Sequence, residues 1–476
     1  MMNMIFSFDS WLNQVITGTN DAIWAYFLIY VLIGCGLFFT WKTKFVQFRM
    51  IGEMIRLLTD SISNSNGKKH ISSFQAFAVS VATRVGTGNL AGVATAIAVG
   101  GPGSIFWMWL IALIGSSTAF VESTLAQLFK IRSKESFIGG PAYYIQKGLH
   151  NRWMACLFAI LMILTFGLSY NSIQSNTICS AMYEAFDIPH SLSGAILVLL
   201  SLIIVFGGIQ RIAKVSSVIV PFMAIGYFIL ALVVIILNYN LIPHVFKFII
   251  DSAFGIHQFA GGAIGVTMMH GIKRGLFSNE AGEGSAPNVA ATASVSHPIK
   301  QGLIQALGVF TDTLVVCSCT AFIILISGLY TNPELNGIML TQNALQAEIG
   351  NSGPVFIALA IFFFAFSSII GNYYYGESNL RFLTSSKTAL QIYRIASGGL
   401  FVIFGAFASL DLVWSIGDLC MALITICNLV ALIKLCKYVF RLLTDYRQQK
   451  KSGIKEPKFH KHILPDIAQD IDCWNE

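Results

Sequence analysis

The segment TRVGTGNLAGVA, residues 83–94, places glycine and polar residues inside a run that is otherwise apolar enough to cross a bilayer. Glycine in a helix interior is less favourable than alanine by about 1 kcal/mol. Unwound backbone survives at membrane depth only where it is buried in protein or lines a cavity. The half-helix after such a break presents free N–H groups and a positive dipole end, which suit a carboxylate. We therefore expect Gly86, Thr87, Gly88 and Asn89 to bind a carboxylate.

A second segment with closely spaced glycines is FAGGAIGVTMMHGIKRGLFSNEAGEG, residues 259–284. The C-terminal end of a half-helix exposes carbonyl groups, which suit an ammonium group. The residues expected to supply this second anchor are Gly261, Gly262, Ala263, Gly265 and Thr267. Small residues also serve close helix packing, but packing explains neither Asn89 nor the second break. Two such anchors together predict a site for a zwitterion, such as an amino acid.

The amino-acid composition indicates the kind of structure in which these two segments lie. The chain is 55% hydrophobic and only 11% charged, whereas soluble domains carry about 25% charged residues. A crossing helix needs about 20 apolar residues, and eleven runs qualify, two of them irregular. We expect an all-α polytopic membrane protein with spans at 23–41, 71–99, 102–129, 153–182, 192–208, 214–238, 254–290, 301–328, 353–379, 392–409 and 411–436.

The basic residues give an independent test of this scheme, because they favour the cytoplasmic side. With the N-terminus outside, all but four of the 30 basic residues fall in inner segments. The exceptions are Lys247, Arg84, Lys273 and Arg274. We therefore expect a cytoplasmic C-terminus in the cell membrane of a prokaryote, and the net charge of +7 indicates a topology signal rather than nucleic-acid binding.

Each irregular run is followed by four further runs, so the chain divides into two units of five spans. An odd number makes the two units enter the membrane from opposite sides, which is the sequence pattern of a secondary transporter with an inverted repeat. Residues 1–22 hold no Lys or Arg, so no cleavable signal peptide is expected. The expected divisions are an extracellular 1–22, an extra helix and loop 23–70, repeats 71–238 and 251–436, and a basic cytoplasmic tail 437–476.

Ionisable residues within the spans are candidates for function by default. Arg84 adjoins the first break, where it either balances a carboxylate such as Glu122 or extends to cytoplasmic water. Asp312, in GVFTDTLVV, is either a second cation or proton site or a hydrogen-bonded structural carboxylate.

Four more ionisable residues lie in the second irregular run. The sequence places them in its inner part, where they are expected to form a cytoplasmic gate rather than to contact substrate. They are Lys273, Arg274, Glu280 and Glu283.

Two long motifs resemble the alanine/glycine:cation symporter family. They are VGTGNLAGVATAIAVGGPGSIFWMW, residues 85–109, and LFSNEAGEGSAPNVAATA, residues 276–293. The resemblance implies a leucine-transporter-like fold and uptake of alanine, glycine or, in some members, glutamine, coupled to sodium and sometimes protons.

The resemblance also implies a sodium site. It would join the hydroxyls of Ser367 and Ser368 to carbonyls of Ala82 and Val85, oxygen ligands that suit a hard cation. The alternative for the two serines is that their hydroxyls bond to the preceding turn of their own helix.

Walls of the expected pocket are Phe166, Tyr170 and Asn372, although aromatics at such spacing are more often core. A channel would show a repeated pore-lining motif, and a membrane enzyme would need a converging catalytic set; neither pattern is visible. No nucleotide-binding loop occurs. The sequence therefore predicts a symporter rather than an enzyme, without a cofactor, whose partners are a small neutral amino acid, sodium or a proton, and the lipid bilayer.

Overall fold

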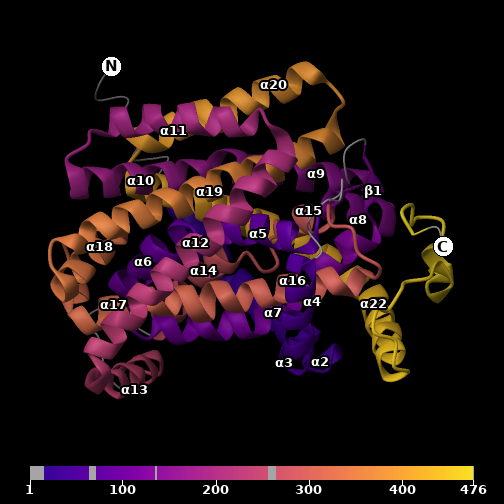
Figure 1. Ribbon diagram of the computed structural model, residues 1–476, viewed down its shortest axis with the longest axis horizontal. Helices are drawn as coiled ribbons and strands as arrows, with labels where there is room; N and C mark the ends of the chain where they lie inside the picture. The colour runs from indigo at the N-terminus through magenta and orange to yellow at the C-terminus, as the bar shows by residue number, and fades with distance from the viewer. Residues whose placement is uncertain (1–15, 64–70, 134–136, 256–263, 475–476) are drawn as a thin grey trace.

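The computed structural model describes residues 16–63, 71–133, 137–255 and 264–474. Within these ranges the chain is helical apart from one short antiparallel pair of strands, in which Ile131 pairs with Ile138. Most long helices run roughly along the longest axis of the molecule (Figure 1). The strand β1, the helix α8 and the C-terminal segment lie at one end of that axis, and α13 and α18 lie at the other (Figure 1).

The first half of the described chain contains the elements that lead to and follow the first irregular segment. They are the π-helical turn η1 (Trp24–Leu28), α2 (Ile29–Lys42), α3 (Val46–Arg49), α4 (Ile51–Ser63), α5 (Ser73–Arg84), the π-helical turn η2 (Gly88–Gly92), α6 (Val93–Gly100), α7 (Ser104–Leu128), β1 (Ile131–Arg132), β2 (Phe137–Ile138), α8 (Pro141–Gly148), α9 (Arg152–Met162), η3 (Ile163–Tyr170), α10 (Asn171–Phe186), α11 (His190–Val205), α12 (Gly208–Leu237), η4 (Tyr239–Leu241) and α13 (Ile242–Ala253).

The second half contains the elements around and after the second irregular segment. They are α14 (Ile264–Asn279), α15 (Ala286–Ala290), α16 (Pro298–Val309), η5 (Phe310–Cys317), α17 (Ser318–Ser327), η6 (Leu329–Thr331), α18 (Gly337–Ile349), α19 (Ser352–Leu383), α20 (Lys387–Ile395), η7 (Ala396–Leu400), α21 (Phe401–Phe407), α22 (Leu410–Lys451), η8 (Lys461–Ile463) and η9 (Pro465–Ile467).

Length and composition identify a membrane protein. Among the described residues, 8 helices are long and apolar enough to cross a bilayer, and Gly88–Gly100 and His190–Val205 are shorter apolar helices. Large apolar side chains of α12 face outward, for example Val218 at 68% and Phe222 at 75% exposure. Such a surface suits lipid rather than water.

The interior of the bundle contains many polar side chains. Helix α7 buries Ser116, Ser117, Glu122, Ser123 and Thr124 along one stretch. It packs against α14 and α16, while α19 packs against α5 and α10. In lipid, a buried polar group needs a protein partner, so these six helices form the framework in which a polar site is held.

Two helices are interrupted in this framework. The first interruption lies at residues 85–87, between α5 and η2, as the sequence predicts. The second lies at residues 280–285, between α14 and α15. Of the residues predicted to form the second break, Gly265 and Thr267 belong to the continuous helix α14, so the prediction is wrong for these two, whereas Gly261, Gly262 and Ala263 lie outside the described residues.

The chain after α22 folds back over one end of the bundle (Figure 1). Phe459 N donates to the carbonyl of Ser296 at 2.9 Å, and the hydroxyl of Ser296 donates to the carbonyl of Pro457 at 2.7 Å. The indole N–H of Trp474 donates to the carbonyl of Gln127, at the end of α7, at 3.1 Å. The C-terminal segment is thus a packed part of the molecule.

Candidate functional site

The first interruption is set up by a helix with a well-formed start and an abrupt end. Ser72 and Gln75 form a reciprocal capping box at the start of α5. The helix stops at Val85, whose φ of −76° and ψ of 93° are extended. The N–H of Gly86 then donates to Oδ1 of Asn89 at 2.9 Å, so a side chain of the next half-helix satisfies the unwound backbone.

A residue that the sequence does not single out completes this arrangement. Both the backbone N–H and the hydroxyl of Thr87 donate to Oε1 of Gln174 on α10, at 3.0 and 2.7 Å. Two donors of Thr87 therefore converge on one amide oxygen. An amide oxygen carries a partial negative charge, and a carboxylate in its place would carry a full one. An isolated glutamine in a helix gives no local signal, so only the fold reveals Gln174.

Glycines at this break allow close packing. A Cβ on Gly86 would lie 2.4 Å from Oγ of Ser368 and 2.9 Å from Oε1 of Gln174. A Cβ on Gly88 would lie 3.0 Å from Cα of Ser278. The predicted residues Gly86, Thr87, Gly88 and Asn89 are therefore together and fully enclosed by α10, α14 and α19.

The serine pair of α19 reaches the same break. Ser367 Oγ and Ser368 Oγ lie 3.2 and 2.9 Å from the carbonyl oxygen of Ala82. Each hydroxyl also lies within hydrogen-bond distance of the carbonyl of Phe364, one turn earlier, at 2.8 and 3.1 Å. The geometry is compatible with both interpretations of the pair. The hydroxyls can bond to the preceding turn of their own helix, and they also face the carbonyl of Ala82 at the break.

The second interruption is held by a carboxylate from α7. The backbone of the interruption, residues 280–285, has positive φ at Glu280, Gly282 and Gly284. Glycine adopts this conformation without strain. The N–H groups of Gly282 and Gly284 donate to Glu122 at 3.3 and 3.2 Å. Asn428 of α22 donates to the same carboxylate at 2.9 Å and to the carbonyl of Gly282 at 2.8 Å.

Two further carboxylates belong to this loop itself. Glu280 accepts from the hydroxyls of Ser285 and Thr83, and Glu283 accepts from the hydroxyl of Tyr170 at 3.2 Å. Both side chains are buried. Because Thr83 belongs to α5, Glu280 links the second break to the first.

Asp312, on η5, is a second link between the interrupted helices. Its carboxylate accepts from Asn89 Nδ2 at 2.7 Å, from Ser278 Oγ at 2.7 Å and from Thr313 Oγ1 at 2.9 Å. Asn89 follows the first break and Ser278 precedes the second. The arrangement is that of a fully hydrogen-bonded carboxylate, one of the two interpretations that the sequence leaves open.

Of the two sequence interpretations of Arg84, extension to cytoplasmic water is the one that the structure contradicts. It is 1% exposed, so it does not extend to water. Its Nη1 donates to the carbonyl of Gln305 at 3.2 Å, whereas Nε and Nη2 have no hydrogen-bond partner. Within the described residues no ion pair joins Arg84 to Glu122. Arg84 is therefore a buried cation beside a group of buried carboxylates.

Lys273 and Arg274 occupy a different place from the one predicted. They lie in α14, before the second break, rather than in the half-helix that follows it. Arg274 makes a bidentate pair with Asp418 of α22 at 2.8 and 3.0 Å, and Lys273 contacts the same carboxylate at 3.2 Å. They are thus separated from Glu280 and Glu283 by the end of α14, and the four residues do not form one gate.

Aromatic side chains lie between this ion pair and the first break. Phe277 packs against Tyr170 and Trp414, each with a ring-centre distance of 4.7 Å, and Trp414 stacks under Arg274 at 4.2 Å. Phe166 packs against Tyr170, also at 4.7 Å. The predicted walls Phe166 and Tyr170 therefore belong to one aromatic layer beside the break.

Asn372, the remaining predicted wall, lies one turn after Ser368 on α19 and is 1% exposed. Neither its Nδ2 nor its Oδ1 has a hydrogen-bond partner. A buried amide without partners is costly in a folded protein. It is therefore a polar group available to a ligand.

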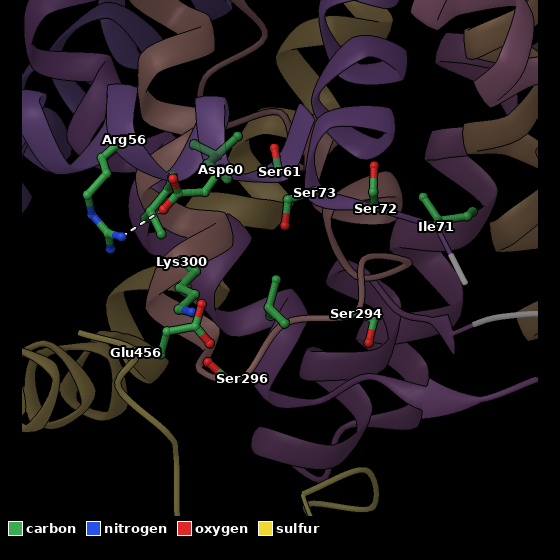
Figure 2. Close-up of a pocket in the computed structure, with 13 residues that line it drawn as sticks. Arg56, Asp60, Ser61, Ile71, Ser72, Ser73, Ser294, Ser296, Lys300 and Glu456 are labelled. Atoms are coloured by element: carbon green, nitrogen blue, oxygen red, sulfur yellow. Dashed lines mark hydrogen bonds and ion pairs between the residues drawn. The ribbon is translucent and has the colours of Figure 1, made fainter. Parts of the chain in front are cut away.

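A polar pocket of about 430 Å³ opens at the start of α5 (Figure 2). Its wall includes Ser72 and Ser73 at the start of α5, Ser294 and Ser296 of the loop after α15, and Glu456 of the C-terminal segment. Figure 2 shows Arg56 paired with Asp60 across its rim, so the lining carries both signs of charge. The pocket lies a full half-helix away from the residues at the break.

Comparisons with known proteins identify the family of the chain. Residues 9–461 match the sodium:alanine symporter family. The chain is 50% identical to the probable sodium/glutamine symporter GlnT of Bacillus subtilis (strain 168), over 97% of this chain and 96% of that protein. It is 34% identical to the sodium/alanine symporter AgcS of Methanococcus maripaludis, over 93% and 99% of the two chains.

The fold has a solved counterpart as well. The crystal structure of MhsT in complex with L-phenylalanine matches with a TM-score of 0.54 at 12% identity, covering 79% of this chain and 99% of that one. This likeness concerns the fold, which is that of leucine-transporter-like proteins. The chain thus belongs to the sodium:alanine symporter family and is a multi-pass, cation-coupled amino-acid symporter rather than an enzyme.

Proposed function

We propose that this protein imports a small neutral amino acid, alanine or glycine, together with sodium by alternating access. The observation that carries the proposal is the pair of donors of Thr87, which converge on Oε1 of Gln174 at the first break. A substrate carboxylate replaces that amide oxygen with a full negative charge and makes stronger hydrogen bonds with the same donors. Asn372, with its unpaired amide, supplies a further polar contact.

The place of the ammonium group follows from the interruption at the end of α14. Residues 280–285 carry unwound backbone, and the carboxylates of Glu280 and Glu283 are buried there. We place the ammonium of the substrate near the end of α14, where Phe277 and Ser278 pack against Gly88. Gly265 and Thr267 then have no direct part in binding.

The sodium ion is proposed at Ser367, Ser368 and the carbonyls of Ala82 and Val85. Hydroxyl and carbonyl oxygens are ligands that a hard cation prefers, and unwound backbone is where such sites form in transporters of this architecture. The two hydroxyls already face the carbonyl of Ala82. The site adjoins Gly86, so ion and substrate would stabilise the same conformation of the break.

Glutamine is the second candidate substrate. It is favoured by the 50% identity to a relative described as a probable sodium/glutamine symporter. The backbone donors at the break recognise any α-amino acid, so the side chain must be distinguished by the aromatic layer of Phe166, Tyr170 and Phe277. Proton coupling, in place of sodium, is the corresponding alternative for the ion.

The membrane arrangement is also part of the proposal. The 8 long helices, the two interrupted helices and α11 together would make eleven crossings. Repeats of five crossings at 71–238 and 251–436 would follow one extra helix, with the N-terminus outside and the C-terminal segment in the cytoplasm. The distribution of basic residues supports this orientation.

Uptake into proteoliposomes tests the function. We expect labelled alanine to accumulate only with an inward sodium gradient, and unlabelled glycine to compete better than glutamine. Stronger competition by glutamine than by alanine or glycine would favour the second candidate. Accumulation that ignores both sodium and pH gradients would contradict symport altogether.

A serine variant tests the ion site. We expect S367A/S368A to raise the sodium concentration for half-maximal uptake by ten-fold or more. Ser352→Ala, an exposed serine at the start of the same helix, is the control and should leave sodium dependence unchanged. Unaltered sodium dependence in the double variant would remove the pair from the ion site.

A further inference from the structure

A basic cavity of about 640 Å³ lies apart from the interrupted helices, where β1 and the start of α20 contribute to one wall. Figure 1 shows β1 beside α8 at one end of the molecule. Its walls come from β1, from the turn between α11 and α12, from the end of α19 and from the start of α20. Four basic side chains line it, and Glu377 is the one acid in the described lining. The four are Arg132, Arg381, Lys387 and Arg394.

Internal pairing neutralises only part of this charge. Arg381 pairs with Glu377 at 2.6 Å, and Arg394 approaches the same oxygen at 3.8 Å. No ion pair within the described residues includes Arg132 or Lys387, and both are exposed. The cavity therefore retains an excess of positive charge, which attracts an anion.

The surroundings of the cavity indicate what kind of anion fits. Helix α20 places Ile392 and Ile395 on the surface at 63% and 58% exposure, and Phe206, part of the cavity wall, is 50% exposed. The guanidinium of Arg394 lies 5.5 Å from the ring of Phe206. A charged recess thus adjoins an apolar surface at the end of crossing helices.

We propose that this cavity binds the headgroup of an anionic phospholipid from the inner leaflet, with its acyl chains along the exposed apolar side chains of α20. Arginine binds phosphate oxygens in bidentate fashion. Serine hydroxyls at 385 and 386, in the same wall, are further donors. Basic recesses between crossing helices on the cytoplasmic side are a recurrent form of such sites.

The test compares purified full-length protein with two lipids of identical acyl chains, phosphatidylglycerol and phosphatidylcholine, by native mass spectrometry. We expect phosphatidylglycerol to remain bound preferentially. The variant R132Q/K387Q removes two exposed charges of the cavity and should weaken that binding by ten-fold or more, because each basic residue near an anionic surface contributes roughly 1 kcal/mol, about five-fold.

The control variant K434Q/K437Q removes the same charge from exposed positions of α22 that do not line the cavity, and should retain phosphatidylglycerol. Equal lipid binding by R132Q/K387Q and the wild type would overturn the proposal. So would displacement of the lipid by millimolar inorganic phosphate, which would show a site for free phosphate instead. Unchanged thermal unfolding of both variants without added lipid verifies that they fold.

Discussion

Asn89, just after the first break, donates its Nδ2 hydrogen to Oδ1 of Asp312 at 2.7 Å. The other oxygen of Asp312 accepts from Ser278, near the end of α14, at 2.7 Å. One carboxylate therefore joins the two interrupted helices. Since Asn89 Oδ1 also accepts from the N–H of Gly86, a change at Asp312 reaches the unwound backbone itself.

Substitutions of Asp312 should distinguish a structural role of its carboxylate from a role in binding a cation or proton. Asp312→Ala removes the acceptor of the 2.7 Å hydrogen bonds from Asn89 Nδ2 and Ser278 Oγ, and the loss of such a buried hydrogen bond costs about 1–3 kcal/mol. Asp312→Asn keeps one acceptor oxygen and should lose less stability. Thermal unfolding of the purified variants measures this order.

Uptake by Asp312→Asn then decides whether the carboxylate also handles an ion. If the role is structural, the sodium and pH dependence of uptake should stay that of the wild type while the maximal rate falls. A changed sodium stoichiometry or a lost pH dependence would instead assign Asp312 to a cation or proton site.

Two glycine variants test how tightly the first break is packed. Gly86→Ala places a Cβ 2.4 Å from Ser368 Oγ and 2.9 Å from Gln174 Oε1, so both proposed sites must shift. We expect uptake to fall by at least a hundred-fold. Gly265→Ala meets nothing within 4 Å and should transport normally. Loss of uptake in Gly265→Ala would restore residues 261–265 to the binding site.

The two interruptions differ in how well they can be predicted from the residues around them. The first was located correctly because Gly86, Thr87, Gly88 and Asn89 are all at the break itself. The second prediction rests on the closely spaced glycines at 261–265, of which Gly265 lies in the continuous helix α14 and residues 261–263 lie outside the described part of the chain. The sequence analysis does not predict the unwound backbone at 280–285, where Glu122 of α7 and Asn428 of α22 hold it. Partners so far away along the chain cannot be recognised from a short stretch of sequence.

The other differences have the same origin. Lys273 and Arg274 lie before the interruption at 280–285, which the sequence analysis does not predict, and their partner Asp418 is far along the chain. The sequence does not predict a role for Gln174, because a single glutamine in a helix has no distinctive pattern. Its role appears only in the fold, where the N–H of Thr87 donates to it. Ser367 and Ser368, in contrast, came from the resemblance to a family and were found facing Ala82.

The buried pair of Arg274 and Asp418 should be sensitive to loss of one partner. Asp418→Asn leaves two buried cations without a counter-charge, and breaking such a pair costs about 3–5 kcal/mol. We expect a clearly lower midpoint of thermal unfolding. Asp187→Asn, an exposed aspartate in the left-handed conformation that asparagine tolerates, is the control. Equal midpoints for the two variants would show that the pair contributes little.

Lys130 gives a prediction for pH, because it lies just beyond α7 under the C-terminal segment. Its Nζ donates to Gln127 Oε1 at 2.8 Å and to the carbonyl of Ala293 at 3.0 Å, with the ring of Trp474 at 4.8 Å. Burial lowers the pKa of Lys130 from 10.5 to about 7. Between these two values the unfolded chain holds more protons than the folded protein, so stability rises with pH across this window and does not change from this source below it.

Thermal unfolding between pH 7 and pH 9.5 measures this dependence. Lys130→Met carries no titrating group, so the part of the pH dependence that Lys130 causes should disappear. Lys434→Met, at an exposed position of α22, should keep the slope of the wild type. If Lys130→Met shows the same rise with pH as the wild type, the ammonium of Lys130 is not released in the folded protein, and its two carbonyl partners are strong enough to hold it charged.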